Sequence, residues 1–222
     1  MIDDQGQVRS LADAGQSFFA GRVAALDDAA FAGASGLPGW SRAHVVAHVA
    51  LNAFALGNLA EWATTGVETP AYPSPAARDA DIELHAHWSP AELRQLTARS
   101  GEHIVAAWSR VPDWSVLVRN SQGRELPVGE TVWLRTREVW IHAVDLADGT
   151  RFTDAPPEFL DGLLHDIRST WAKNGVALTL EATDRGDAAG DVRGSAADLA
   201  AWATGRPGGA VVGATAEPPA WM

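Results

Sequence analysis

Apolar side chains recur every three or four residues over long stretches of the chain, which is the period of an α-helix with one buried face. The first stretch runs from about Val8 to Phe31, and the second follows Ser41 and ends at Gly66. Serine is a favourable residue at the start of a helix and glycine at its end. This pattern predicts two long helices in the first third of the chain.

Start signals and turn residues define the other elements of the first 150 residues. Ser89-Pro90-Ala91-Glu92 combines a capping serine, a proline at the first helical position and a glutamate that completes a capping box. A polar turn at 120–123 lies between two short apolar stretches, as in a β-hairpin. The expected elements are a short helical piece from Ser74-Pro75 to about Trp88, a helix from Pro90 to about Arg110, a hairpin of residues 116–118 and 125–128, and a helix from Glu130 to Ala147.

Four long helices with one hairpin predict an antiparallel four-helix bundle over residues 1–150, in which facing side chains can hold a metal ion. The remainder, 151–222, has a different pattern and predicts a small α+β domain. We expect a helix opened by Pro156 and Pro157 and reaching Trp171, a strand over 176–182, a turn over 184–191, a helix from Ser195 to about Thr204, and a short strand over 210–212. The fold class is therefore α+β.

Charge and composition restrict the partners. The chain has 17 Lys+Arg against 28 Asp+Glu, a formal net charge of −11, so we expect no nucleic-acid partner. Binding of an anionic ligand would need a few well-placed arginines to offset the repulsion from this negative net charge. There is no cysteine, which excludes disulfides and protein thiolates. No segment resembles a signal peptide or a membrane span, and we expect a cytoplasmic protein without a membrane partner.

The fourth long helix carries a pair of metal-ligand side chains. Glu138 and His142 are four residues apart and project from one helical face. His48 lies beside the apolar face of the second helix and is the natural third ligand. Two histidines and one glutamate leave a fourth position of a zinc ion open, as in catalytic zinc sites, although this ligand set also accepts iron, manganese or nickel. Arg135 and Asp145 lie on the same side and can support the ligands.

A structural interpretation competes with the metal site. A Glu/His pair at this spacing is common on helices, and a histidine on an apolar face is often a hydrogen-bonded core residue. His44 competes with His48, because it lies one turn earlier on the same helix. Four further histidines have no evident partner, and we expect them at the surface or around the site: His85, His87, His103 and His165.

Several segments resemble one known family. Three segments carry the first part of the resemblance: Leu37-Pro38-Gly39-Trp40-Ser41-Arg42-Ala43-His44, which continues to His48 and Asn52; Trp62 to Gly66; and Glu68-Thr69-Pro70. Together they resemble the first half of mycothiol-dependent maleylpyruvate isomerases. Residues 137–146, Arg-Glu-Val-Trp-Ile-His-Ala-Val-Asp-Leu, resemble the second signature of these enzymes, and Glu217-Pro218-Pro219-Ala220-Trp221-Met222 resembles their carboxyl terminus. The histidine and Glu-x-x-x-His pattern alone marks the broader DinB-like bundle superfamily.

The resemblance implies a set of residue roles. The positions that match the zinc ligands are His48, Glu138 and His142, and this match favours His48 over His44. Arg206 matches an arginine that the family requires for activity, although here Pro207 follows it where a small residue is expected. Arg78 matches a second arginine that can bind an anionic group. The implied partners are mycothiol and a small dianionic substrate, in a monomer or small homo-oligomer.

The resemblance also implies a reaction, the conversion of maleylpyruvate to fumarylpyruvate in the gentisate route of aromatic degradation. A metal-bound thiol is deprotonated, so the mycothiol sulfur can add to the conjugated alkene, permit rotation and leave again. Arg206, with Arg78, would hold the carboxylates and the developing enolate.

Three alternatives remain open at this point. A mycothiol S-transferase would use the same thiolate and release the adduct. A hydrolase would activate water at the open metal position, with Asp145 or His44 as candidate base. A non-enzymatic module would bind a small apolar ligand, with the histidines in structural roles.

Overall fold

The computed structural model describes residues 5–214 and 217–221 of the chain. The chain divides into two compact units, one ending at Asp148 and the other beginning at Gly149. The expected boundary, between residues 150 and 151, lies close to this point. The first unit is helical with one hairpin, and the second combines helices with a short sheet, so the predicted α+β class is confirmed.

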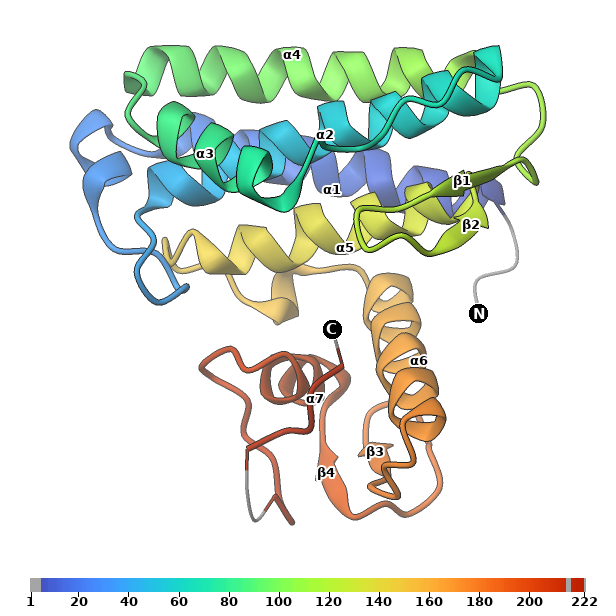
Figure 1. The fold of residues 1–222 in the computed structure, drawn as a ribbon. Coiled ribbons are helices and arrows are strands. Elements are labelled where there is room, and N and C mark those ends of the chain that lie inside the picture. Colours follow the sequence, from blue (N-terminus) through green and yellow to red (C-terminus); the bar gives the residue numbers. More distant parts are fainter. Residues whose placement is uncertain (1–4, 215–216, 222) are drawn as a thin grey trace. The chain divides into compact units, whose positions relative to one another are not determined.

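The first unit is built on four long helices, which lie side by side (Figure 1). Helix α2 packs against α4 and α5, and α1 packs against the same two helices, which gives the bundle its core. The bounds of the four helices are α1 Gln5–Ala25, α2 Arg42–Thr65, α4 Pro90–Ser109 and α5 Glu130–Asp145.

Helix α2 is the central helix of this bundle. Among the described residues it is the one helix long and apolar enough to cross a membrane, but 72% of its most apolar window is buried inside the protein. The alanines, valines and leucines of α2 therefore form core contacts between helices. A helix that is mostly buried is apolar over most of its surface because neighbouring elements cover that surface.

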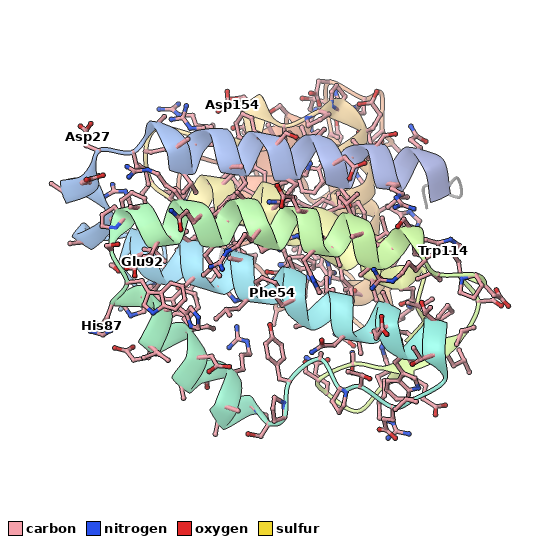
Figure 2. The ribbon with its side chains drawn as sticks, turned by 90° about the horizontal axis from the view of Figure 1, so that it is seen from above. Asp27, Phe54, His87, Glu92, Trp114 and Asp154 are labelled. Atoms are coloured by element: carbon pink, nitrogen blue, oxygen red, sulfur yellow. The ribbon has the colours of Figure 1, made fainter. Side chains whose placement is uncertain are left out.

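The predicted helix starts are confirmed at atomic detail. Ser41 accepts a hydrogen bond from the His44 amide, and the His44 side chain accepts one from the Ser41 amide. Ser89 and Glu92 form the same reciprocal arrangement at the start of α4, where Figure 2 shows Glu92. Gly66 ends α2 with a φ of 74°, a left-handed conformation that favours glycine.

Smaller elements complete the first unit. Helix α3, Pro75–Ala86, packs on α2. Strands β1, Leu117–Arg119, and β2, Glu125–Pro127, form the predicted antiparallel hairpin, in which Val118 and Leu126 are paired and buried. The hairpin packs against α2 and α5.

The prediction of one continuous helix from Val8 to Phe31 is wrong at its end. Helix α1 ends at Ala25, and a short 3₁₀ helix, η1, follows at Asp28–Ala32. Asp27, at the break in Figure 2, has an extended conformation and precedes η1. The apolar spacing continues across the break because Leu26 and Phe31 are both buried in the core, so periodicity alone does not reveal it.

The second unit is a small core between two helices and a parallel strand pair. Helix α6 packs on α7, and strand β3 pairs with β4. Phe159, Leu163, Ile167 and Leu199 are fully or almost fully buried. The bounds are η2 Phe152–Asp154, α6 Pro157–Lys173, β3 Leu180–Ala182, β4 Val192–Gly194 and α7 Ala196–Ala203.

The strands of the second unit differ from the prediction. The strand expected over 176–182 is limited to β3, because the Val176 amide bonds the Trp171 carbonyl at the end of α6 and Thr179 bonds the Asp191 side chain. The strand expected over 210–212 is reduced to one bridge between Arg193 and Val212. Strand β4 was not predicted, since three residues, Val-Arg-Gly, carry no alternating pattern.

Candidate metal centre

Three side chains from two packed helices meet inside the bundle. His48 Nε2 on α2 lies 3.0 Å from Glu138 Oε2 and 3.1 Å from His142 Nε2, both on α5. His142 Nε2 lies 3.2 Å from Glu138 Oε2. Two ligands of one tetrahedral zinc ion, each about 2.0 Å from the metal, are separated by about 3.3 Å. The three atoms therefore have nearly the separations that a shared metal ion requires.

The bundle positions these side chains by ordinary helix packing. Glu138 and His142 are one turn apart on α5, so they project from the same face of the helix, and the contact between α2 and α5 brings His48 opposite them. The side chain of His48 is 8% exposed, that of His142 13% and that of Glu138 26%. The cluster is thus largely shielded by protein, and Glu138 retains some exposure.

Asp145 supports the cluster from behind, as its place in the sequence predicts. Its Oδ2 lies 2.8 Å from His142 Nδ1, and the carboxylate is fully buried. A carboxylate at this nitrogen holds a proton on Nδ1 and orients Nε2 toward the cluster. Once Nε2 loses its proton, His142 therefore has the tautomer and orientation of a metal ligand.

The protonation of the three side chains is coupled. Burial raises the pKa of the Glu138 carboxyl, but His48 and His142 outweigh burial and hold this pKa well below its usual value. Burial lowers the pKa of His142, while the hydrogen bonds to Asp145 and Glu138 raise it more strongly, to about 9. Burial is the largest influence on His48 and lowers its pKa. An ionised carboxylate beside a neutral and a protonated imidazole is a site in which a cation can replace a proton.

Among the described residues, Arg135 forms no hydrogen bond or ion pair with the three ligands, so the expected support is limited to its charge, which acts on Glu138. Its guanidinium donates to the Val49 carbonyl at 2.6 Å, to Asn52 Oδ1 at 3.0 Å and to Gln16 Oε1. The side chain is buried, and burial lowers its pKa to about 10. Arg135 therefore links α5 to α2 and α1 and places a positive charge one turn before Glu138.

Arg78 lies beside the cluster on helix α3. Its Nη2 is 3.3 Å from His48 Nδ1, and its Nη1 donates to Asp79 Oδ1 at 2.7 Å. The structure thus brings one of the two predicted anion-binding arginines to the ligand histidine.

The competing histidine, His44, is engaged elsewhere. Its Nδ1 lies 2.7 Å from Ser41 Oγ, and its Nε2 lies 3.2 Å from Glu83 Oε2. The Trp40 ring covers this end of α2, with its centroid 6.1 Å from that of His44 and 5.5 Å from that of His48. The remaining histidines lie outside the described metal-ligand group: His85, His87, His103 and His165.

Tyr72 is a residue of this region that the sequence analysis missed. It lies in the loop between α2 and α3, and burial raises the pKa of its hydroxyl to about 12, a shift that Arg78 opposes. The charges of Glu138 and Arg135 also act on it. The available signal was composition, because Tyr72 is the only tyrosine in the chain.

Arg206 belongs to the second unit and is described there by itself. It follows α7 and Gly205, whose φ is 72°. Its amide donates to the Ala201 carbonyl at 2.8 Å, and its Nη1 donates to the Thr204 carbonyl at 2.6 Å. Together with Trp202 and Trp221 it lines an open cavity of about 820 Å³. A role of Arg206 in activity stays a prediction.

The comparisons with known proteins extend over nearly the whole chain. Residues 12–147 match the family model of the mycothiol maleylpyruvate isomerase N-terminal domain. A crystal structure of the mycothiol-dependent maleylpyruvate isomerase is similar with a TM-score of 0.90 and 38% identity, covering 98% of this chain and 97% of that one. The structure of a histidine-to-alanine variant of that enzyme matches equally well. No curated protein sequence matches significantly. The chain belongs to the mycothiol maleylpyruvate isomerase family.

Proposed function

We propose that the protein is an isomerase that converts maleylpyruvate to fumarylpyruvate with mycothiol as thiol cofactor and zinc as the metal. The observation that carries this proposal is the group of His48, Glu138 and His142 within the fold of the family. The family match supports the reaction class, and the ligand group supports a metal-activated thiol.

The donor set fits a catalytic metal ion. Two imidazoles and one carboxylate provide three ligands, and a zinc ion bound to them keeps a fourth position for a ligand from solution. A metal ion in this place supplies a positive charge that deprotonates a thiol at neutral pH. The chain has no cysteine, so the thiol must come from outside the chain, and the family match points to mycothiol.

Arg78 is a binding group for a substrate carboxylate in this proposal. When Nε2 of a neutral His48 binds a metal, the imidazole proton resides on Nδ1. Nδ1 lies 3.3 Å from Arg78 Nη2, and two N–H donors facing each other form no hydrogen bond. Metal binding therefore releases this contact and makes Arg78 available to an anion. Arg206 is proposed as the residue that holds the second carboxylate and the developing enolate.

The reaction needs temporary loss of one double bond. Bound mycothiol would supply a thiolate that adds to the alkene, allows rotation about the resulting single bond and is then eliminated unchanged. Arginines that hold the carboxylates and the enolate oxygen stabilise the charge where it develops.

The first test is an ultraviolet assay with maleylpyruvate, with and without mycothiol, together with metal analysis of the same sample. The proposal expects mycothiol-dependent formation of fumarylpyruvate and about one zinc ion per chain. A zinc-loaded protein that conjugates mycothiol to electrophiles and leaves maleylpyruvate unchanged would instead be an S-transferase. A metal-free protein that does not take up zinc would contradict the enzyme assignment and support the small-ligand module.

The resemblance to the family also implies a setting for the proposed reaction. We propose a cytoplasmic enzyme of the gentisate route of aromatic degradation. Its partners are then the dianionic substrate and mycothiol, with the protein acting as a monomer or small homo-oligomer.

A further inference from the structure

His44 is the histidine of helix α2 that the metal centre does not use. It is the third residue of α2, and its Nδ1 accepts a hydrogen bond from the Ser41 amide at 3.2 Å. A neutral imidazole that accepts at Nδ1 carries its proton on Nε2. His44 Nε2 lies 3.2 Å from Glu83 Oε2 on helix α3, so the imidazole donates to this carboxylate. His44 therefore joins the start of α2 to α3.

The imidazole of His44 is the anchored member of this pair. Its side chain is 19% exposed, whereas that of Glu83 is 65% exposed. The Trp40 ring stacks on the imidazole with a centroid distance of 6.1 Å and an interplanar angle of 27°. The hydrogen bond from Ser41 and the stacking of Trp40 hold His44 in place, and Glu83 is bound to it from the solvent side.

Helix α3 has little apolar surface that could hold it on the bundle. All of its residues from Pro75 to Ala86 are described, and Ile82 alone is buried. An isolated helix of twelve residues is marginal in water, so contacts with α2 decide where α3 lies. Among the described residues, two side-chain hydrogen bonds join these helices, one between His44 and Glu83 and one between Arg78 and His48.

The two hydrogen bonds fix the register of α3 on α2. His44 and His48 are one turn apart, about 6 Å along the axis of α2, and Arg78 and Glu83 are about 7.5 Å apart along α3. The earlier residue of each helix meets the later residue of the other, so the helices run in opposite directions along this contact. The bond between His44 and Glu83 therefore helps to fix the place of Arg78 beside the metal centre.

We infer that His44 is a positioning residue, whose hydrogen bond to Glu83 holds α3 so that Arg78 faces the substrate beside the metal centre. This inference rests on the proposed function, in which Arg78 binds a substrate carboxylate. In that function zinc binding releases Arg78 from His48. The bond between His44 and Glu83 is then the side-chain hydrogen bond that remains between the two helices in the described part of the chain.

Removal of the acceptor on α3 tests the inference in the zinc-loaded enzyme. Glu83→Ala should raise KM for maleylpyruvate about 3- to 10-fold, as for the loss of one partly exposed hydrogen bond, while kcat and zinc content stay close to wild type. Asp81→Ala is the matched control, because it removes the same charge from α3 and its exposed carboxylate bonds no described residue. Glu83→Gln keeps an acceptor oxygen and should retain a KM close to wild type.

Amide hydrogen exchange of α3 gives a second readout that does not depend on turnover. Alanine favours a helix more than glutamate or aspartate does, so a purely local effect would slow exchange in Glu83→Ala and in Asp81→Ala. Loss of the bond to His44 predicts the opposite for Glu83→Ala, namely exchange of residues 75–86 that is about 3- to 10-fold faster. Exchange in Asp81→Ala should be unchanged or slower.

A double-variant cycle assigns the effect to His44. The variant His44→Leu also weakens the cap of α2, so its own effect combines two causes. Glu83→Ala made in the His44→Leu protein should change KM and the exchange of α3 no further, because the shared bond is already lost. An effect of Glu83→Ala that is equal in both backgrounds overturns the role of His44.

The outcomes separate this inference from the proposed function. Wild-type KM in Glu83→Ala, or wild-type exchange of its α3, overturns the positioning role. An inactive wild-type enzyme in which Glu83→Ala speeds the exchange of α3, and does so only when His44 is present, contradicts the isomerase proposal and upholds the contact that holds α3.

Discussion

The two units of the protein carry their candidate residues on different kinds of structure. In the first unit, His48, Glu138 and His142 come from helices of 24 and 16 residues that pack along the bundle core. In the second unit, Arg206 follows a helix of eight residues and lies in a glycine-rich loop beside an open cavity. The ligand atoms of the bundle are fixed by buried neighbours, whereas the Arg206 side chain has a backbone carbonyl, that of Thr204, as acceptor.

This difference matches the needs of the two kinds of chemistry. Metal binding requires several ligand atoms at fixed separations, because small displacements weaken coordination. A guanidinium that binds a substrate whose charge shifts during the reaction can be placed on a loop, where many binding residues of proteins are found. The comparison leads to a division of roles, in which changes in the bundle alter metal content and changes in the loop of the second unit alter turnover alone.

The largest expected effect is the loss of a ligand in the bundle. His48→Ala or His142→Ala removes one of three ligands, so zinc content and isomerase activity should both fall to the background of the assays. Metal analysis and the ultraviolet assay on the same preparation measure this result. His165→Ala, an exposed histidine of α6, is the control and should retain both properties. A His142→Ala enzyme that retains zinc would contradict the proposal that the bundle determines metal content.

The next effect concerns the second unit. Arg206→Ala should lower kcat about 10²- to 10³-fold, the cost of losing one donor to a developing oxyanion, while one zinc ion per chain is retained. Lys173→Ala removes an exposed cation from the same unit and should have no effect. Loss of zinc in Arg206→Ala would contradict the division of roles between the two units.

A smaller effect on zinc affinity is expected from Asp145, which contacts the ligand His142. Asp145→Asn weakens the hydrogen bond acceptor that holds the Nδ1 proton of His142, so zinc affinity should decrease about 10- to 100-fold. Competition with a chelator of known affinity measures this change. Activity should return at higher zinc concentration, because the three ligands are still present. Failure of added zinc to restore activity would show that Asp145 has a role beyond orienting His142.

The smallest effect is the dependence of zinc affinity on pH. The pKa of His142 in the metal-free protein is raised from 6.5 to about 9, so its charged form stabilises the metal-free fold fully below about pH 6.5, and this contribution is lost as pH rises through 9. Zinc must displace that proton, and its affinity should increase about tenfold per pH unit between these values. Chelator competition at pH 7 and pH 8 measures the slope. A flat profile would mean that His142 is neutral before zinc binds.

The long helices and the group of metal ligands could both be predicted from the sequence, and for the same physical reason. Long helices repeat their apolar faces, and the spacing between Glu138 and His142 defines a shared face without knowledge of the tertiary fold. The apolar neighbours of His48 favoured it over His44, and the resemblance to the family agreed with that choice. The structure adds a local reason, because His44 caps its own helix through Ser41.

The features that sequence reasoning did not give depend on contacts between distant segments. Arg135 was expected beside the ligands, but its three acceptors come from α1 and α2, which no spacing on α5 reveals. The break after Ala25 is hidden because Phe31 returns to the core. Tyr72 lies in a proline-containing loop without periodicity, and its electrostatic coupling to Arg78 and Glu138 arises only in the folded chain.

X-ray absorption at the zinc edge of the loaded protein, before and after addition of mycothiol, tests the central claim most directly. The chain contains no cysteine, so a short zinc–sulfur distance must come from the added thiol. The account predicts nitrogen and oxygen neighbours at about 2.0 to 2.1 Å without mycothiol, and one additional sulfur at about 2.3 Å with it. A zinc shell that contains no sulfur at saturating mycothiol would contradict activation of the thiol by this metal centre.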